Sequence, residues 1–201
     1  MDTAPHSSTH LDDELDEVLI GGREPGTVEI VAYDPRWRTR FEAERRRIAA
    51  ALGPLARRIE HIGSTSVPDL AAKPIVDVLV EVDDPGREED YAGHLREAGY
   101  ELRVREPRHR MFRTPARDVH VHVWPAGCRE GADYLLLREW LRAHAEDRRL
   151  YEGAKRELAG RPWRDMNYYA EAKSPVIAGI MARARAFRSP EDQAPHRRLP
   201  R

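Results

Sequence analysis

The residues best suited to chemistry lie in a short loop and in two apolar segments that come later in the chain. The loop, Gly63-Ser64-Thr65, combines a glycine with two hydroxyl side chains. Glycine lets the backbone turn tightly or be approached closely by a ligand, and neighbouring N–H groups and hydroxyls can then face an anion. This composition indicates a loop that binds phosphate, although Thr65 can equally cap a short helix.

The carboxylate of Asp77 interrupts the apolar run over residues 75–82 near its start, and Glu81 stands near its end. The run is β-branched almost without a break, as expected of a strand that is covered on both faces. A charge in such a strand costs on the order of several kcal/mol unless a partner or a cation meets it. We therefore expect Asp77 to face a cleft and to bind a cation, most simply Mg²⁺ that bridges substrate phosphates. The alternative is a strand-end carboxylate that caps the backbone or pairs with Arg110.

Two histidines, His120 and His122, alternate with valines over residues 119–123. Because side chains alternate along a strand, both imidazoles lie on one face. Their spacing suits Zn²⁺ or Mn²⁺, or acid–base chemistry, and with Asp77 they would form a 2-His-1-carboxylate set if the strands are adjacent. Incidental surface histidines are the alternative. His61, just before the loop, is a similar candidate, and a hydrogen bond to a carbonyl is its alternative role.

Other basic and aromatic side chains are candidates for the same ligand. Lys73 precedes the first of these strands and can neutralise a phosphate. A basic cluster over residues 103–113 includes Arg110, which can bind a polyphosphate or an acidic polymer, or guard the edge of a hairpin. Tyr169 and Lys173 are four residues apart on a predicted helix and can close a cleft from that side. Packing is the alternative for the aromatic ring.

The elements that position these residues follow a simple order, with strands early in the chain and helices late. Asp34 and Pro35 are typical of a helix start, and Gly53 and Pro54 of its end. Proline at position 175 predicts that the last helix is kinked or begins near Ser174. We expect strands over residues 76–82, 100–105, 111–114 and 119–124, and helices over residues 35–52, 88–98, 134–144, 147–160 and 168–185. Residues 28–31 form a short strand or an extended entry, and residues 55–62 a strand or a helix-to-strand transition.

At 201 residues the chain is most simply one domain with tails. Residues 1–26 combine an acidic patch, a helix-like apolar stripe and a glycine- and proline-rich end, so we expect a flexible tail with one marginal helix, or else a docking segment. Residues 189–201 contain three prolines and mixed charge, and a second flexible tail is expected there. The domain between them spans residues 27–188.

The composition narrows the class of protein. Lysines and arginines number 34 against 35 aspartates and glutamates, so the net charge gives no support to nucleic-acid binding. No apolar run approaches the roughly 20 residues that span a bilayer, and the first residues lack a signal-peptide pattern, so we expect no membrane partner. The single cysteine, Cys128, fits a reducing compartment, and we expect a cytoplasmic location. Nothing in the sequence indicates an oligomeric state.

Three phrases of the sequence resemble the GrpB family: V-E-I-V-A-Y-D-P-R-W before the loop, E-H-I-G-S-T-S-V-P-D-L-A-A-K-P-I-V-D-V around it, and H-V-H-V-W after it. The resemblance covers residues 27–187. That family is similar to the nucleotidyltransferase superfamily, whose signature is Gly-Ser, then two carboxylates two apart on one strand, and a third on a neighbouring strand. Gly63, Ser64 and Asp77 match the first part, whereas Leu79 stands at the second carboxylate position.

The resemblance implies an α/β (α+β) fold, with a nucleotidyltransferase-like small mixed sheet, flanking helices and a C-terminal helical group. It also implies a nucleotide or a small phosphorylated ligand, held by the Gly-Ser loop and a divalent metal, either Mg²⁺ or Mn²⁺/Zn²⁺. His120 and His122 would then stand in the place of the third carboxylate. Lys73 would neutralise a phosphate of the ligand.

Three functions are open at this point. The first is transfer of a nucleotidyl or phosphoryl group from a nucleoside triphosphate to a small acceptor. The second is binding of a nucleotide or phosphometabolite without catalysis, which Leu79 favours. The third is hydrolysis that depends on a metal held by the 2-His-1-carboxylate set. A second acidic group beside Asp77, for which Glu81 and Asp118 are the candidates, would favour the first function over the second.

Overall fold

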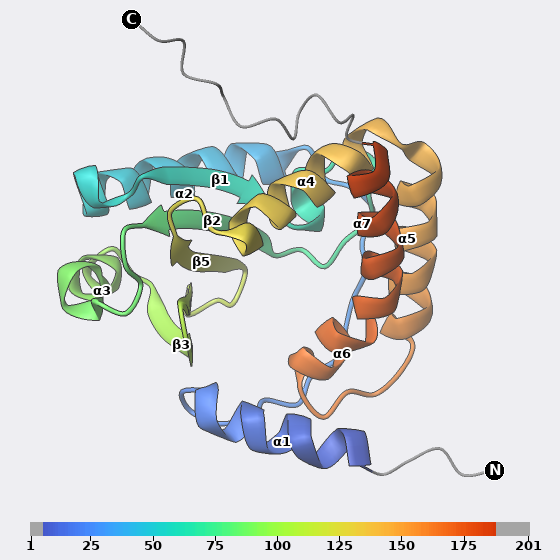
Figure 1. Cartoon of the computed structure of the whole chain (residues 1–201), viewed down its shortest axis with the longest axis horizontal. Helices are drawn as coiled ribbons and strands as arrows, with labels where there is room; N and C mark the ends of the chain where they lie inside the picture. Colours follow the sequence, from blue (N-terminus) through green and yellow to red (C-terminus); the bar gives the residue numbers. More distant parts are fainter. Residues whose placement is uncertain (1–5, 188–201) are drawn as a thin grey trace, which may run out of the picture.

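The computed structural model describes residues 6–187, so the tail expected over residues 189–201 lies outside the described part. A five-stranded sheet in the order β1–β2–β5–β4–β3 forms the centre of the molecule (Figure 1). β2 runs antiparallel to β1 and parallel to β5, and β4 is antiparallel to both of its neighbours. The mixed α/β fold expected from the sequence is thus confirmed. The strands are β1 (Arg58–Ile62), β2 (Val76–Val82), β3 (Glu101–Glu106), β4 (His109–Arg113) and β5 (Val119–Pro125).

One face of the sheet is covered by α2 (Arg36–Leu52) and α3 (Glu88–Glu97). The side chains of Val78 and Val80 in β2 and of Val121 in β5 are fully buried against these helices. Burial of such side chains contributes roughly 1.5–3 kcal/mol each, so this layer is the main core. Because strand residues alternate, the residues between these valines must face the opposite side of the sheet.

The C-terminal helices form a group at the other side of the sheet (Figure 1). α4 (Arg129–Ala143) contacts β1 and β5, and α7 (Ser174–Phe187) contacts α4 and α5 (Ala145–Ala159). The short α6 (Met166–Ala172) joins α5 to α7. These helices have an apolar core of their own, in which Leu70 from the chain before β2 is also buried. The group therefore packs beside the sheet as a separate helical layer.

The N-terminal helix α1 (His6–Val18) packs against β3 (Figure 1). Leu15 and Leu19 are buried in contact with Val104, and Leu19 forms an isolated β-bridge with the same residue. Leu15 lies in the last turns of the helix and Leu19 directly follows its end, so both side chains reach the same residue of β3. The helix expected within residues 1–26 is therefore present and packs on the sheet, whereas residues 1–5 lie outside the described part.

Two helix boundaries in the C-terminal group differ from expectation. α4 begins earlier than predicted, directly after Cys128, because the Cys128 thiol accepts a hydrogen bond from the Gly131 backbone at 3.3 Å and caps the helix. The helix expected over residues 168–185 is divided into α6 and α7. α7 begins at Ser174, in agreement with the start that Pro175 predicts, since proline suits the first turn of a helix.

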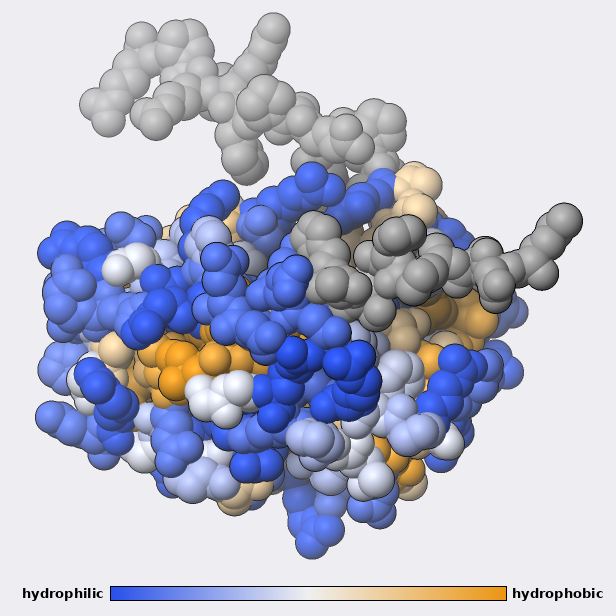
Figure 2. Space-filling model, turned by 90° about the horizontal axis from the view of Figure 1, so that it is seen from below, coloured by the Kyte–Doolittle hydropathy of each residue, from blue (hydrophilic) through white to orange (hydrophobic). Residues whose placement is uncertain are grey.

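The surface on the side where α1 lies is mainly hydrophilic, with smaller hydrophobic areas between the charged side chains (Figure 2). This distribution agrees with a content of 34% charged residues in the chain. Within residues 6–187, no helix is both long enough and apolar enough to cross a membrane.

Candidate functional site

The Gly-Ser loop follows β1 and lies directly over Asp77. Gly63 has φ +69°, a conformation that glycine adopts at little cost, and a Cβ at this position would overlap the Asp77 carboxylate. The Ser66 hydroxyl closes the turn by donating to the Gly63 carbonyl at 2.6 Å. In this arrangement Ser64 lines a cleft together with Asp77.

Asp77, His120 and His122 meet on the sheet face opposite α2 and α3, and we name them the cation site. β2 and β5 are adjacent, with Asp77 level with His120. Asp77 Oδ1 lies 3.5 Å from His120 Nδ1 and 3.6 Å from His122 Nε2, and one ligand atom from each residue lies within 4.8 Å of the others. The side chains are 17–27% exposed, so an ion can reach them. Two imidazoles and a carboxylate at this spacing fit a divalent transition metal.

The charge state of Asp77 suits a cation. Burial raises the pKa of the Asp77 carboxyl, but its contacts with His120 and His122 outweigh burial and hold that pKa well below its usual range. The carboxylate is therefore ionised at neutral pH. An ionised carboxylate beside imidazole nitrogens is the form that binds metal, because protons compete for the same atoms.

A further histidine, His109 of β4, positions His122. His109 Nε2 lies 3.2 Å from His122 Nδ1, and His109 Nδ1 lies 2.6 Å from Glu106 Oε2. The His109 ring also stacks on Trp124, with the ring centroids 4.3 Å apart. Carboxylate–histidine contacts of this kind fix the tautomer and the orientation of a metal-binding imidazole. They leave His122 Nε2 directed toward Asp77.

Lys73, Lys155 and Lys173 line the same cleft, and we name them the lysine wall. Lys155 is 2% exposed and donates to the Ala71 carbonyl. The ammonium groups of Lys73 and Lys173 lie 5.4 and 4.7 Å from the centroid of the Tyr169 ring. Burial lowers the pKa of all three, that of Lys155 to about 7. No salt bridge to a lysine is found within residues 6–187, so an anionic ligand would stabilise all three.

These three are the only lysines of the chain, whose other 31 basic residues are arginines. Every lysine thus lies in one cleft, while arginines supply the rest of the positive charge. An ammonium group is a compact charge whose pKa responds readily to burial, whereas a guanidinium stays charged. The charge of the lysines in the cleft therefore responds to burial more readily than that of the arginines beside them.

The cleft has a volume of about 520 Å³ and a positive lining. Seven basic side chains line it against three carboxylates, although the net charge of the chain is −1. The buried Tyr169 hydroxyl, which also belongs to the lining, has no hydrogen-bond partner among the described residues. This lining fits a ligand with several negative charges. The basic residues are Lys73, Arg103, Arg113, Arg117, Arg138, Lys155 and Lys173.

Most of the site residues predicted from the sequence line this cleft. They are Gly63, Ser64, Thr65, Lys73, Asp77, His120, His122, Tyr169 and Lys173. The Thr65 hydroxyl, however, donates to the Ile75 carbonyl at 3.1 Å. Its oxygen therefore holds the loop against the start of β2 rather than facing a ligand.

Two predicted residues, His61 and Arg110, do not line the cleft, and the structure corrects their assignment. The His61 ring is buried against Phe41 of α2, with ring centroids 4.6 Å apart, and burial lowers its pKa to about 4. Arg110 donates to Glu88 of α3. Both side chains lie on the α2/α3 side, because strand neighbours point to opposite faces.

No second carboxylate joins Asp77 among the described residues. Leu79 is fully buried. Glu81 and Asp118, the two candidates, each pair with an arginine, at 3.7 and 2.9 Å. In the part of the chain that the structure describes, imidazoles rather than carboxylates therefore accompany Asp77.

Several residues of the cleft were not singled out from the sequence. Arg113 stands opposite His120 in the β4–β5 register, so it shares the face of the cation site. The strand register alone reveals that Arg113 faces the cation site, and the same holds for His109. Lys155 lies one helical turn from Tyr151, over whose ring its ammonium sits at 4.7 Å. The rarity of lysine in the chain is the signal that could have found it.

Fold and site together define a mixed α/β protein in which an Asp-His-His cluster, with the spacing of a metal site, lies in a basic cleft. The chain belongs to the GrpB family: the model of the GrpB protein family matches residues 27–183. It is 56% identical over 170 residues to a UPF0157 protein of Streptomyces coelicolor, covering 85% of this chain and 91% of that protein. It is 43% identical over 191 residues to a UPF0157 protein of Halalkalibacterium halodurans, covering 92% and 98%. The family predicted from the sequence is thus confirmed.

Solved structures agree with this assignment. The crystal structure of the conserved protein GrpB from Enterococcus faecalis matches with a TM-score of 0.68 and 30% identity, covering 78% of this chain and 96% of that one. A cytoplasmic RNA terminal U-transferase matches with a TM-score of 0.44 and 14% identity, covering 74% and 43%. The second likeness is too low to bear on function.

Proposed function

We propose that this protein binds a nucleotide or a related oligophosphate together with a divalent cation, and transfers a nucleotidyl or phosphoryl group from it. The observation that carries the proposal is the presence of the cation site and the lysine wall in one cleft. The first offers ligands for a metal, and the second offers positive charge without carboxylate partners. Phosphate transfer depends mainly on positioning and on neutralising charge, which these groups can supply.

Each part of the cleft has a role in this proposal. Asp77, His120 and His122 hold the cation, which when bound supplies Lewis-acid stabilisation of charge on phosphate oxygens. The imidazole nitrogens favour Zn²⁺ or another transition metal over Mg²⁺, which prefers oxygen ligands. The lysine wall neutralises the phosphates, and the Ser64 hydroxyl with the backbone of Gly63 contacts them from the loop.

In the transfer, an oxygen of the acceptor forms a new bond to phosphorus, and the bond from phosphorus to the leaving phosphate oxygen breaks. The proton of the acceptor hydroxyl is released to solvent, and the lysine wall stabilises the charge on the departing phosphate. Hydrolysis is the second candidate, with water in place of the acceptor. It is favoured by the imidazole ligands and by the single carboxylate, Asp77, at the cation site.

Calorimetric titration of ATP with Mn²⁺, Zn²⁺ or Mg²⁺ into the full chain tests the proposal. We expect ATP binding that requires a metal in the wild type. Asp77→Asn should remove the dependence of ATP binding on metal. The double variant Lys73→Gln with Lys173→Gln should weaken ATP binding by more than about tenfold, or 1.4 kcal/mol. Arg38→Gln, an exposed residue of α2 that is not part of the cleft lining, is the control for loss of one positive charge. ATP binding that is unchanged in the lysine variant would contradict the proposal.

The lysine composition allows an independent measurement. Amine-reactive labelling followed by mass spectrometry reports on the cleft alone, apart from the chain's α-amino group, because all lysines lie there. ATP with metal should protect the three lysines from labelling. The ³¹P NMR spectrum of the same mixture identifies the phosphorus-containing products, and so distinguishes transfer, which requires an acceptor, from hydrolysis. Labelling that ATP does not alter would place the nucleotide elsewhere.

A further inference from the structure

Residues 19–27, which we name the strap, connect α1 to the rest of the domain, and Leu19 and residues 24–27 of this segment line the cleft. On the sheet side, Arg103 of β3 donates to two carbonyl groups of the strap, one of them Gly22 at 2.6 Å. On the helical side, the Glu24 backbone amide donates to Asp165 at 2.7 Å, and Asp165 caps α6. The strap is thus held by both the sheet and the C-terminal helices.

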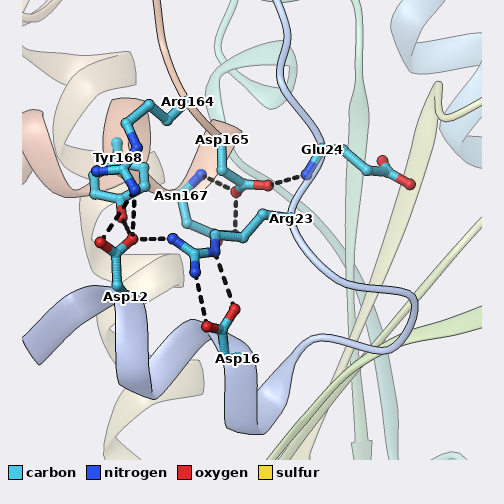
Figure 3. Close-up of polar contacts among 8 residues, drawn as sticks. All are labelled: Asp12, Asp16, Arg23, Glu24, Arg164, Asp165, Asn167 and Tyr168. Atoms are coloured by element: carbon cyan, nitrogen blue, oxygen red, sulfur yellow. Dashed lines mark hydrogen bonds and ion pairs between the residues drawn. The ribbon is translucent and has the colours of Figure 1, made fainter. Parts of the chain in front are cut away.

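Charged contacts also hold the strap to α1 and α6 (Figure 3). Arg23 donates two hydrogen bonds to Asp16, at 3.0 and 2.7 Å, and pairs with Asp12. Asp12 in turn accepts from the hydroxyl of Tyr168 in α6. The carboxylate of Glu24 points away from this cluster, although its backbone amide belongs to it (Figure 3). The strap is therefore fixed independently of the Glu24 side chain.

The Glu24 carboxylate instead meets the arginines of the cleft. It accepts two parallel hydrogen bonds from Arg113, at 2.8 and 2.9 Å, and a third contact from Arg117 at 3.2 Å. The hydrogen bonds from Arg113 lower the pKa of Glu24 to about 2. A forked arginine–carboxylate pair is the geometry by which proteins recognise carboxylate and phosphate groups of ligands.

The arginines remain in excess after this pairing. Within residues 6–187, Glu24 is the only carboxylate that forms a salt bridge with Arg113 or Arg117. Arg103 is 5% exposed, and among the described residues its guanidinium donates hydrogen bonds only to strap carbonyls. Because Arg113 also stands opposite His120, this positive group lies beside the cation site, on the β4 side.

We propose that Arg113, Arg117 and Arg103 form a subsite for an oxyanion of the acceptor, a small molecule that carries a carboxylate or a phosphate group. Glu24 occupies the subsite as an internal substitute for that group, and the acceptor displaces it. The strap itself stays in place, because Arg103, Arg23 and Asp165 hold it without the Glu24 carboxylate. The role in acceptor binding rests on the proposed function, whereas the binding of an oxyanion does not.

Titration of the full chain with inorganic phosphate and, separately, with acetate tests this subsite. Glu24→Gln removes the charge that competes for Arg113, so it should tighten the binding of one or both anions by about tenfold relative to wild type. The anion that gains more identifies the preferred group. Glu29→Gln, an exposed residue with the same change of charge, should produce no gain. Equal affinities in wild type and Glu24→Gln would overturn the proposal.

Two double variants locate the bound anion. Adding Arg113→Gln to Glu24→Gln should abolish the gain, whereas adding Lys73→Gln should preserve it. A gain that disappears only with Lys73 would place the anion at the lysine wall and overturn the subsite. Titration of ATP with Mn²⁺ into the same proteins reports separately on the proposed function, so the two can fail independently.

Folding is checked by circular dichroism, because Glu24→Gln leaves a largely buried guanidinium unpaired. Glu24→Asp keeps the charge but shortens the side chain, so it should loosen the fork with less change in stability. Its anion affinity should fall between those of wild type and Glu24→Gln. An affinity of Glu24→Asp below that of the wild type would contradict displacement of the internal carboxylate.

Discussion

Gly63 packs directly on the side chain of Asp77. A Cβ at position 63 would lie 3.0 Å from both the Cβ and the Cγ of Asp77, which is tighter than most such contacts in proteins, and it would overlap a carboxylate oxygen. The loop and the cation site are therefore one unit. The loop occupies its place only because residue 63 has no side chain, and the loop in turn confines the carboxylate of Asp77.

Replacing Gly63 with alanine should therefore displace Asp77 or the loop. We expect Gly63→Ala to weaken metal binding by about tenfold or more, because the carboxylate leaves its position between the two imidazoles. The φ of +69° adds strain for any other residue, so the melting temperature should fall as well. Calorimetry with Zn²⁺ and thermal unfolding measure both effects. Gly93→Ala, in an exposed part of α3 with open space around it, is the control: it should leave the zinc affinity unchanged and should not lower the melting temperature, because alanine favours a helix over glycine.

Glu106 acts on the cation site through His109. Glu106→Gln should lower metal affinity by roughly 10–100-fold, the usual effect of removing a group that orients a metal-binding histidine. The fold should remain intact, since the residue is only partly buried. Zinc titration of Glu106→Gln and of Glu97→Gln, an exposed residue of α3, checks this expectation. Equal affinities in the two variants would show that the contact between His109 and Glu106 does not position His122.

Lys155 should make stability depend on pH. Its pKa in the folded protein is about 7, below the ordinary value of 10.5, because burial disfavours the charged form. The cost of the buried charge therefore grows as the pH falls from about 10.5 to about 7 and is constant below that. Lys155→Met should melt higher than wild type near pH 7, and the difference should vanish toward pH 10. Thermal melts from pH 6 to pH 10 measure it, with the exposed Arg149→Met as a control without pH dependence.

Because α1 packs on the sheet, replacing a buried side chain of α1 with a smaller one should lower the stability of the protein. Leu15 is 6% exposed and packs with Val104, so Leu15→Ala should destabilise the protein by roughly 2 kcal/mol. Hydrogen exchange should show faster exchange in α1 and in the strap. The same substitution at Leu150, which is 51% exposed, should cost far less. If Leu15→Ala unfolded at the same temperature as wild type, α1 would not contribute to the folded domain.

The sequence by itself determined the features that depend on local pattern. Alternation of histidine and valine places His120 and His122 on one face of a strand. A mostly apolar run identifies β2, in which Asp77 stands out as a charged residue. Glycine at position 63 signals a close approach of another group. Each of these conclusions follows from the spacing of side chains along a single element, for which nearest neighbours are sufficient.

Tertiary structure alone decided which face of each strand meets which layer. Arg110 and Arg113 belong to one basic cluster in the sequence, yet the register of β4 on β5 turns Arg113 toward the cation site and Arg110 toward α3. In the same way, Lys155 and Glu24 reach the cleft from segments 131 residues apart. Long-range pairing sets these positions, because the free energy of burying one face over the other comes from the whole sheet and not from the local chain.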